Sequence, residues 1–221
     1  MKKILSVLLI AVMVLSLNAC GDNSNDNGNS GNVGKIVENP NIPEAVKTSK
    51  IFKALEVFDG DTYSYVIDFG VIEGATIRIY RKGNNIYSDL AGIKTYLVDD
   101  VYYELNPFGD TAEFSRLNQK EIAEQIEKVS NPYVSMVNLS GAQVLSSGKD
   151  IFGGIEREYE EVKTKSGEVV RAFFDGDMLA GLLSKQIESE GGNWIEIKFE
   201  VSDTVDDEVF VVPAHIQRVP K

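Results

Sequence analysis

The side chains best suited to covalent or acid–base chemistry are few and widely separated in this 221-residue chain. Cys20 is the only cysteine, and His215, in the segment PAHIQ, is the only histidine. A cysteine and a histidine can together form a nucleophile and its base, but Cys20 directly follows an apolar leader. The sequence contains no Gly-x-Ser-x-Gly elbow and no His-Glu-x-x-His helix, and zinc lacks a ligand set. The sequence therefore predicts a chain that is not an enzyme.

Acidic side chains form the other candidate chemistry. They cluster at Asp59-Gly60-Asp61, at Asp175-Gly176-Asp177 and between Asp203 and Glu208. Carboxylate oxygens are the ligands of calcium, but aspartate is also the residue that turns use to bond their own backbone. A pair of carboxylates could hydrolyse a glycoside, yet no spacing here singles one out. We expect no metal and no cofactor, and an acidic-site hydrolase is the remote alternative.

The position of Cys20 gives it a different role. Two lysines precede an uncharged apolar run at residues 4–17, which is too short to span a bilayer and is typical of a secretory signal. The junction resembles the bacterial lipobox, with these four residues: Leu17, Asn18, Ala19 and Cys20. The resemblance implies cleavage between Ala19 and Cys20 and diacylglycerol on the Cys20 thiol. The alternative, a reactive thiol or an intermolecular disulfide, does not explain why the cysteine lies at the junction.

Charge and composition then divide the chain. Residues 1–19 form the lipoprotein signal peptide, residues 20–42 hold the acylated cysteine and an Asn/Gly/Ser tether, and residues 43–221 form one folded domain. Two acyl chains anchor a protein stably, which predicts attachment to the outer leaflet of the cell membrane on its extracytoplasmic side. The formal net charge of −12 argues against nucleic acid as a partner.

Periodicity predicts mainly strands in the folded domain. A helix is expected at residues 44–58, where apolar residues recur at intervals of three and four. Residues 62–105 alternate apolar and polar side chains between short turns, which predicts a meander of about five strands. A second helix is expected at residues 118–129, where Asn118 and Glu121 are spaced as a capping box. Further strands are expected at these ranges: 143–147, 155–163, 169–175, 178–187, 194–201 and 209–212.

One of these assignments has an alternative. The apolar residues of 178–187 also form a helical stripe, but turn residues on both sides favour a strand in a hairpin. The predicted architecture is α+β and mostly β, a long, twisted antiparallel sheet with about two helices on a single face.

This arrangement and the stretches FFDGDMLAGLL and WIEIKFEVSDTVDDEVFVVP resemble the lipoprotein-carrier superfamily of LolA, LolB, RseB and the mycobacterial LppX type. In that superfamily a Phe-x-x-Pro motif, here Phe210 to Pro213, ends the last long strand. The resemblance implies an incomplete, half β-barrel whose concave face holds two to three helices. It transfers no catalytic residue to this sequence.

The resemblance also implies an apolar hollow between the sheet and the helices. A hydrophobic small molecule or a lipid would occupy it, with the aromatic face of Tyr63, Tyr65 and Tyr103 as its lining; the alternative is that these are ordinary core residues. The two free edges of such a sheet could instead dock an envelope protein, as in an RseB-like sensing module. The sequence leaves ligand binding and protein binding open.

Overall fold

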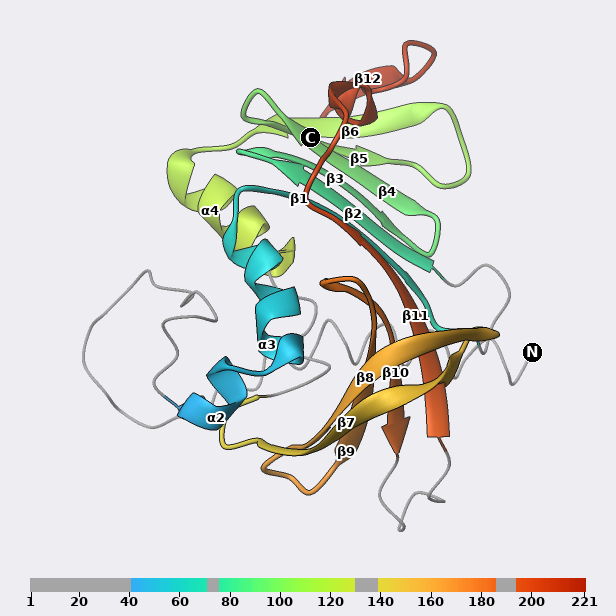
Figure 1. The fold of residues 1–221 in the computed structure, drawn as a ribbon. Helices are drawn as coiled ribbons and strands as arrows, with labels where there is room; N and C mark the ends of the chain where they lie inside the picture. The colour runs from blue at the N-terminus through green and yellow to red at the C-terminus, as the bar shows by residue number, and fades with distance from the viewer. Residues whose placement is uncertain (1–40, 71–75, 130–138, 186–193) are drawn as a thin grey trace.

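The computed structural model describes residues 41–70, 76–129, 139–185 and 194–221. The signal peptide, the lipobox residues and nearly all of the tether lie outside this part of the chain. All twelve described strands belong to one sheet, in the order β12-β6-β5-β4-β3-β2-β1-β11-β10-β9-β8-β7. Figure 1 shows a strongly curved sheet that does not close on itself. The predicted fold class, a mostly-β open half-barrel with few helices, is confirmed.

The strands follow the predicted meander and then a second series of hairpins. The first six are β1 (Thr62–Asp68), β2 (Thr76–Lys82), β3 (Asn85–Leu90), β4 (Ile93–Val98), β5 (Val101–Leu105) and β6 (Thr111–Arg116). The others are β7 (Gln143–Phe152), β8 (Ile155–Lys163), β9 (Val169–Asp175), β10 (Met178–Lys185), β11 (Trp194–Ser202) and β12 (Gln217–Pro220). Every pairing is antiparallel except β12 with β6, which is parallel.

The expected first helix is divided into three short pieces. These are α2 (Glu44–Lys47), α3 (Lys50–Leu55) and the 3-10 helix η2 (Glu56–Asp59). The break falls at Ser49, whose extended backbone and hydroxyl, accepting the N–H of Phe52 at 3.2 Å, begin α3 as an N-cap. A capping serine starts a new helix instead of continuing the old one, so the prediction of one continuous helix was wrong.

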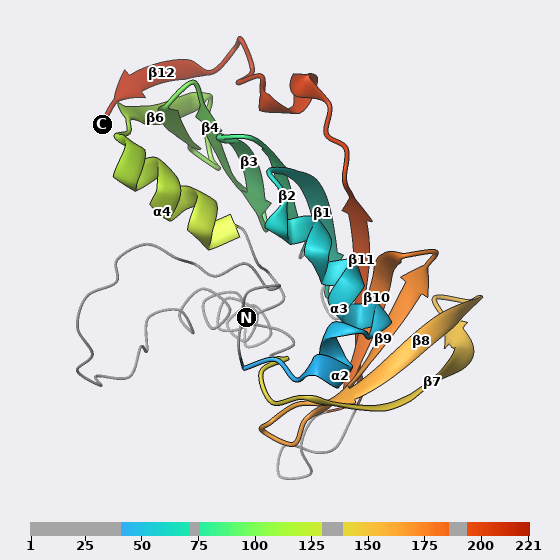
Figure 2. The same cartoon turned by 60° about the vertical axis from the view of Figure 1, so that its left-hand side comes forward.

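The second helix agrees with its prediction. It is α4 (Gln119–Val129), and Asn118 accepts the backbone N–H groups of Lys120 and Glu121 at 3.0 and 3.1 Å. The Glu121 carboxylate in turn accepts the Asn118 N–H at 2.7 Å, which completes the capping box. Figure 2 shows α3 and α4 on the same, concave side of the sheet.

The main core lies between the concave face and helices α2 and α3. Alternate residues of β1 and β11 face it, and the burial pattern of both strands has the period of two expected from the sequence. Helix α3 contributes Ile51, Phe52 and Leu55, each of which is at most 2% exposed. Burying such a side chain stabilises the fold by about 1.5–3 kcal/mol. A smaller cluster of Ile86, Leu97 and Ile122 holds α4 against the other half of the sheet.

The segment after β11 differs from the prediction. Residues 209–212 were expected to form a strand, but Asp207–Phe210 is a 3-10 helix, η4, and the residues after it are irregular. The reason is topological, because β11 is already paired on both sides, with β1 and β10. The chain must cross the outer face to reach β6, as Figure 2 shows, and buries Phe210 and Val212 on the way. The Phe-x-x-Pro motif therefore lies in this crossing and does not end a strand.

Strand β7 is five residues longer than the predicted 143–147, because Gly148 and the residues after it stay in register with β8. The hairpin turns instead at Gly153 and Gly154, which have φ values of 60° and 80°. Positive φ at both central positions is the geometry of the two-residue hairpin turn, and glycine adopts it without strain. The predicted strand at 178–187, by contrast, is confirmed as β10 over residues 178–185, and its last two residues lie outside the described part of the chain.

The absence of a side chain at Gly181 allows the aromatic ring of Phe152 to pack on the outer face of the sheet. Phe152 at the end of β7 stacks on Phe173, with ring centroids 4.6 Å apart. Its ring also covers Gly181 of β10, where a Cβ atom would lie 2.0 Å from the ring. Since no side chain tolerates that contact, Gly181 is the residue that lets Phe152 be buried.

We predict that Gly181→Ala destabilises the protein by about 1–3 kcal/mol, because an added methyl group overpacks this contact. Gly109→Ala is the matched control, since a Cβ there meets nothing closer than 3.4 Å. Urea unfolding of both variants measures the difference. Adding Phe152→Leu to Gly181→Ala should restore part of the loss, and equal stability of the two glycine variants would contradict the packing argument.

Candidate partner-binding edge of the sheet

The structure brings together two of the tyrosines that were expected to line a hollow. Tyr63 and Tyr65, on β1, are 0% and 4% exposed, and both hydroxyls donate to the carbonyl of Val129 at 3.3 Å. Phe58 packs edge-on against both rings. A carbonyl near a helix C-terminus lacks a partner within its helix and has two lone pairs. The two hydroxyl groups thus satisfy the Val129 carbonyl at the C-terminal end of α4. Burial raises the pKa of Tyr65.

Tyr103 lies on the opposite face, so the expectation that it shares a surface with Tyr63 and Tyr65 was wrong. The cross-strand register places Tyr102, not Tyr103, on the concave side. Tyr103 belongs instead to a row across the outer face of β2 to β6: Tyr80, Tyr87, Tyr96, Tyr103 and Phe114. Burial, and then the charge of Asp89, raises the pKa of Tyr87 to about 12.

The other sequence candidates do not converge. Leu17, Asn18, Ala19 and Cys20 lie outside the described residues, and His215 is exposed after η4. In the part of the chain that the structure describes, no three His, Cys, Asp or Glu side chains are grouped as a metal would need. The acids Asp175 and Asp207 instead form ion pairs, with Arg157 at 2.9 Å and with Lys82 at 2.7 Å. None of the helices described is long and apolar enough to cross a membrane.

The two edges of the sheet differ in how they are protected. Strand β12 has four residues and includes Pro220, and short edge strands with proline resist pairing. Strand β7 has ten residues and no proline, and among the described strands it pairs with β8 alone. It also carries large exposed apolar side chains, Leu145 and Ile151, and Ile155 follows across the hairpin turn. Strand β7 is therefore the edge at which the sheet can be extended.

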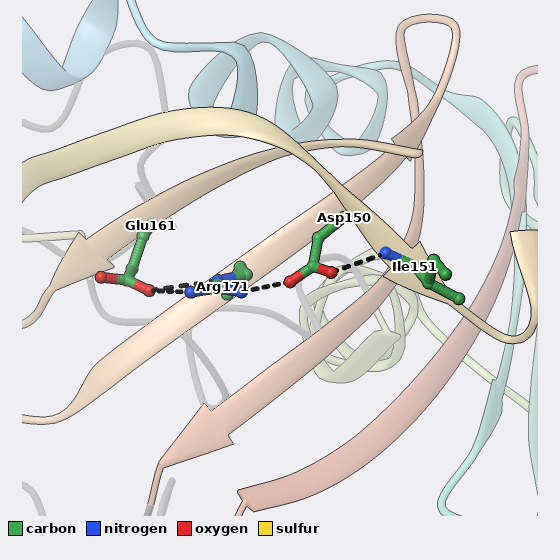
Figure 3. Close-up of polar contacts among 4 residues, drawn as sticks. All are labelled: Asp150, Ile151, Glu161 and Arg171. Atoms are coloured by element: carbon green, nitrogen blue, oxygen red, sulfur yellow. Dashed lines mark hydrogen bonds and ion pairs between the residues drawn. The ribbon is translucent and has the colours of Figure 1, made fainter. Parts of the chain in front are cut away.

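The backbone of β7 presents its polar groups outward at alternate residues. The N–H of Ile151 is bonded at 2.8 Å by the carboxylate of Asp150, from its own strand, instead of by β8 (Figure 3). In an antiparallel ladder inward and outward N–H groups alternate. Ser147 and Lys149 therefore direct their backbone groups away from β8, in the same sense as Ile151.

Next to this edge, the Arg171 side chain of β9 makes polar contacts with β7 and β8 on the outer face of the sheet. Its guanidinium contacts Asp150 of β7 at 2.7 Å and Glu161 of β8 at 2.9 Å, and Figure 3 shows it between the two carboxylates. It also stacks over the ring of Tyr159, 4.4 Å from the centroid, and lies 5.9 Å from that of Trp194. This cation thus ties three neighbouring strands together.

Tyr159 extends this cluster to the edge itself. Tyr159 and Gly148 are cross-strand partners, and a Cβ atom on Gly148 would lie 3.2 Å from the Tyr159 ring and hydroxyl. The phenol therefore leans over the glycine toward the open side of β7. An aromatic ring covering a glycine of an edge strand is a known way of holding strand register.

On the concave side the same strands carry acids. Glu158 pairs with Lys50, and this hydrogen bond lowers the pKa of the Glu158 carboxyl. Glu160 accepts the backbone N–H of Ile51 at 2.8 Å and so joins the start of α3 to β8. Lys149 on β7 lies 3.9 Å from the carboxylate of Glu156. The edge therefore presents Lys149 beside acids on one face and Gly148 with Asp150 on the other.

Sequence reasoning missed this edge because the strand was predicted to end at Ser147, five residues before the end of β7. The signal that identifies it is the pair Gly153-Gly154 between two apolar residues, which is typical of a tight hairpin. Nothing in the sequence indicates that β7 ends the sheet, because strand order depends on long-range pairing.

No protein-family model and no curated protein matches this sequence. The structure is similar to an uncharacterized conserved protein from Thermus thermophilus, over 81% of this chain and 100% of that one, with a TM-score of 0.41 and 8% identity. The MucA/MucB complex of Pseudomonas aeruginosa matches over 77% of this chain and 62% of that chain (TM-score 0.41, 11% identity). A DUF1329 family protein from Desulfovibrio piger ATCC 29098 matches over 73% and 95% (TM-score 0.25, 16% identity). Because these TM-scores are low, we interpret the site from its own geometry.

We predict that Arg171→Gln lowers the free energy of unfolding by about 1–3 kcal/mol, because it leaves the largely buried Glu161 carboxylate without its cation. Lys198→Gln is the matched control: Lys198 and Glu196 are half-exposed on the same face, 3.9 Å apart. That variant should lose less than about 0.5 kcal/mol. Chemical denaturation measures both, and a loss for Arg171→Gln no greater than for the control would show that the cluster is not structural.

Proposed function

We propose that this chain is a non-catalytic binding protein, anchored by lipid on Cys20 to the extracytoplasmic face of a membrane, and that it binds an extended segment of another envelope protein at β7. The free edge of β7 carries the proposal. A partner strand added there gains main-chain hydrogen bonds, and its alternate side chains contact both faces of the sheet. The lipobox resemblance at Cys20 supports the location.

The packing of the concave face favours a protein partner over a hydrophobic ligand. Tyr63 and Tyr65, which were expected to line a hollow, are buried and hydrogen-bonded to the end of α4. A lipid entering there would have to displace Phe58 as well as these two rings. Strand addition at β7 needs no such rearrangement.

The anchor predicts a change of location in the Cys20→Ala variant. Without the thiol no diacylglycerol can be attached, so the protein should accumulate as unprocessed precursor or leave the membrane fraction. Membrane fractionation and mass spectrometry of the amino terminus measure this in the native host. A Cys20→Ala chain that is cut after residue 19 and still fully membrane-bound would refute the anchor.

The edge predicts a specific cross-link in the native host. A photoreactive residue replacing Lys149 should join the chain to one envelope protein, and the linked site should lie within an extended segment. The same residue replacing Lys94, exposed on the central strand β4, is the control. Binding should also protect the outward amides of β7 from hydrogen exchange.

Proline at Ser147 separates edge pairing from other contacts. Ser147→Pro removes an outward N–H without breaking a bond to β8, so stability should change little. Cross-linking from position 149 should fall about tenfold or more, since a main-chain bond is lost and the ring blocks approach. Ser147→Thr, which keeps the N–H, should behave as wild type. Unchanged cross-linking in Ser147→Pro would show that β7 does not bind by strand addition.

A further inference from the structure

The amino-terminal part of the mature chain joins the fold beside the β7 edge, and the inference drawn from this position rests on the strand addition proposed there. The backbone N–H of Gly141, two residues before β7, donates to the carbonyl of Asn41 at 2.9 Å. Ile42, the next residue, is buried in the main core, and α2 then packs against β7. The chain that precedes Asn41 is therefore attached to the fold next to the beginning of this edge strand.

The direction and length of that chain suit pairing with β7. A segment that runs back from Asn41 along β7 is antiparallel to it, because β7 runs away from Gly141 while the segment runs toward Asn41. Seven residues, 33–39, span about 23 Å when extended, which is the length of the first seven residues of β7. Equal counts from Asn41 and Gly141 bring Val37 level with Leu145, an apolar side chain of β7 that is 44% exposed.

The composition of residues 33–39 also differs from that of the tether before them. Residues 21–32 contain only Gly, Asp, Asn and Ser. The segment 33–39 has three β-branched apolar side chains, Val33, Ile36 and Val37, and such residues favour strands. Its one lysine and one glutamate cancel in charge, so the acidic fold does not repel it.

Covalent attachment favours this segment over a separate molecule as the occupant of the edge. Few residues lie between segment and edge, and the Asn41 carbonyl is already bonded beside β7, so pairing costs little loop-closure entropy. A strand from another molecule must also lose translational and rotational freedom. A second copy of this chain would add another net charge of −12, which opposes association.

We propose that residues 33–39 of this chain pair with β7 as an additional antiparallel strand and occupy the edge until a segment of the partner displaces them. The tether thereby regulates the site. The apparent affinity for the partner is reduced by the fraction of molecules in which the edge is open. Only a segment that pairs better than this internal strand gains the edge, which limits the partners that the protein accepts.

Hydrogen exchange of the purified mature chain tests the internal strand. The double variant Ile36→Pro with Val37→Pro removes two consecutive N–H groups, and one of the two must face β7 because successive groups of a strand alternate. The outward amides of β7 should exchange about tenfold faster in this variant than in the wild type. Ser24→Pro with Asn25→Pro, in the Asn/Gly/Ser part of the tether, is the matched control and should leave exchange unchanged.

Cross-linking from the edge identifies the occupant. A photoreactive residue replacing Lys149 should link within the purified chain to residues 33–39, as mapped by mass spectrometry, and the double-proline variant should lose this link. The same residue replacing Lys94 should not form it. In the native host the double-proline variant should raise the cross-link from position 149 to the partner about tenfold, because the edge is then open.

The outcomes distinguish this inference from the proposed function. Equal β7 exchange in the wild type and the double-proline variant, without an internal link, would overturn the internal strand, whereas a partner link from position 149 would leave the proposed function standing. An internal link without any partner link would support the internal strand and overturn the proposed function. A partner link that the prolines do not change would overturn the regulation. A concentration-dependent dimer that protects β7 would make a second copy the occupant and overturn the inference.

Discussion

The pairing of β1 with β11 is the constraint on which the structure depends. It joins a strand that begins at residue 62 to one that ends at residue 202, with Tyr65 opposite Val201 and Ile67 opposite Phe199. Without it the molecule would have two separate sheets, one ending at β1 and the other at β11. The buried side chains of these two strands belong to the same hydrophobic core as those of α3. The pairing joins the two series of strands near the middle of the strand order, which leaves β12 and β7 as the two edges of the sheet.

Local structure was predictable where the signals are short-range. The alternation in β1 and β11, the capping box of Asn118 and Glu121, and the hairpin turn before β10 all involve residues close in sequence, and the structure confirms them. The prediction failed where a distant contact decides. The residues around Phe210 have the pattern of a strand, but no strand position was open beside β11, so the chain crosses the outer face instead.

The candidate site shows the same division. Tyr63 and Tyr65 are two residues apart on one strand, so their shared face follows from the period of two. Tyr103 lies four strands away, and its face depends on the lengths of all the intervening turns, because a shift of one residue reverses it. The edge at β7 could not be derived at all from the sequence, since edge position is a property of strand order. The lipid anchor, by contrast, is predicted from the sequence alone, because its signal is confined to the residues around Cys20 and does not depend on the fold.

The protective features of β7 indicate selective pairing at this edge. Natural edge strands avoid association through charges, bulges and short length. Strand β7 has a bulge between Val144 and Ser146, a lysine at position 149 and an aspartate that covers the N–H of Ile151, yet it keeps its length and its exposed apolar side chains. An edge blocked against all strands would resemble β12, four residues long with a proline. The bulge and the Asp150 carboxylate protect the two ends of β7, whereas the outward backbone groups of Ser147 and Lys149 between them stay open, with the Lys149 charge beside them. The residues that disfavour strand pairing at the two ends of β7 thus also define the stretch between them at which a partner strand can pair.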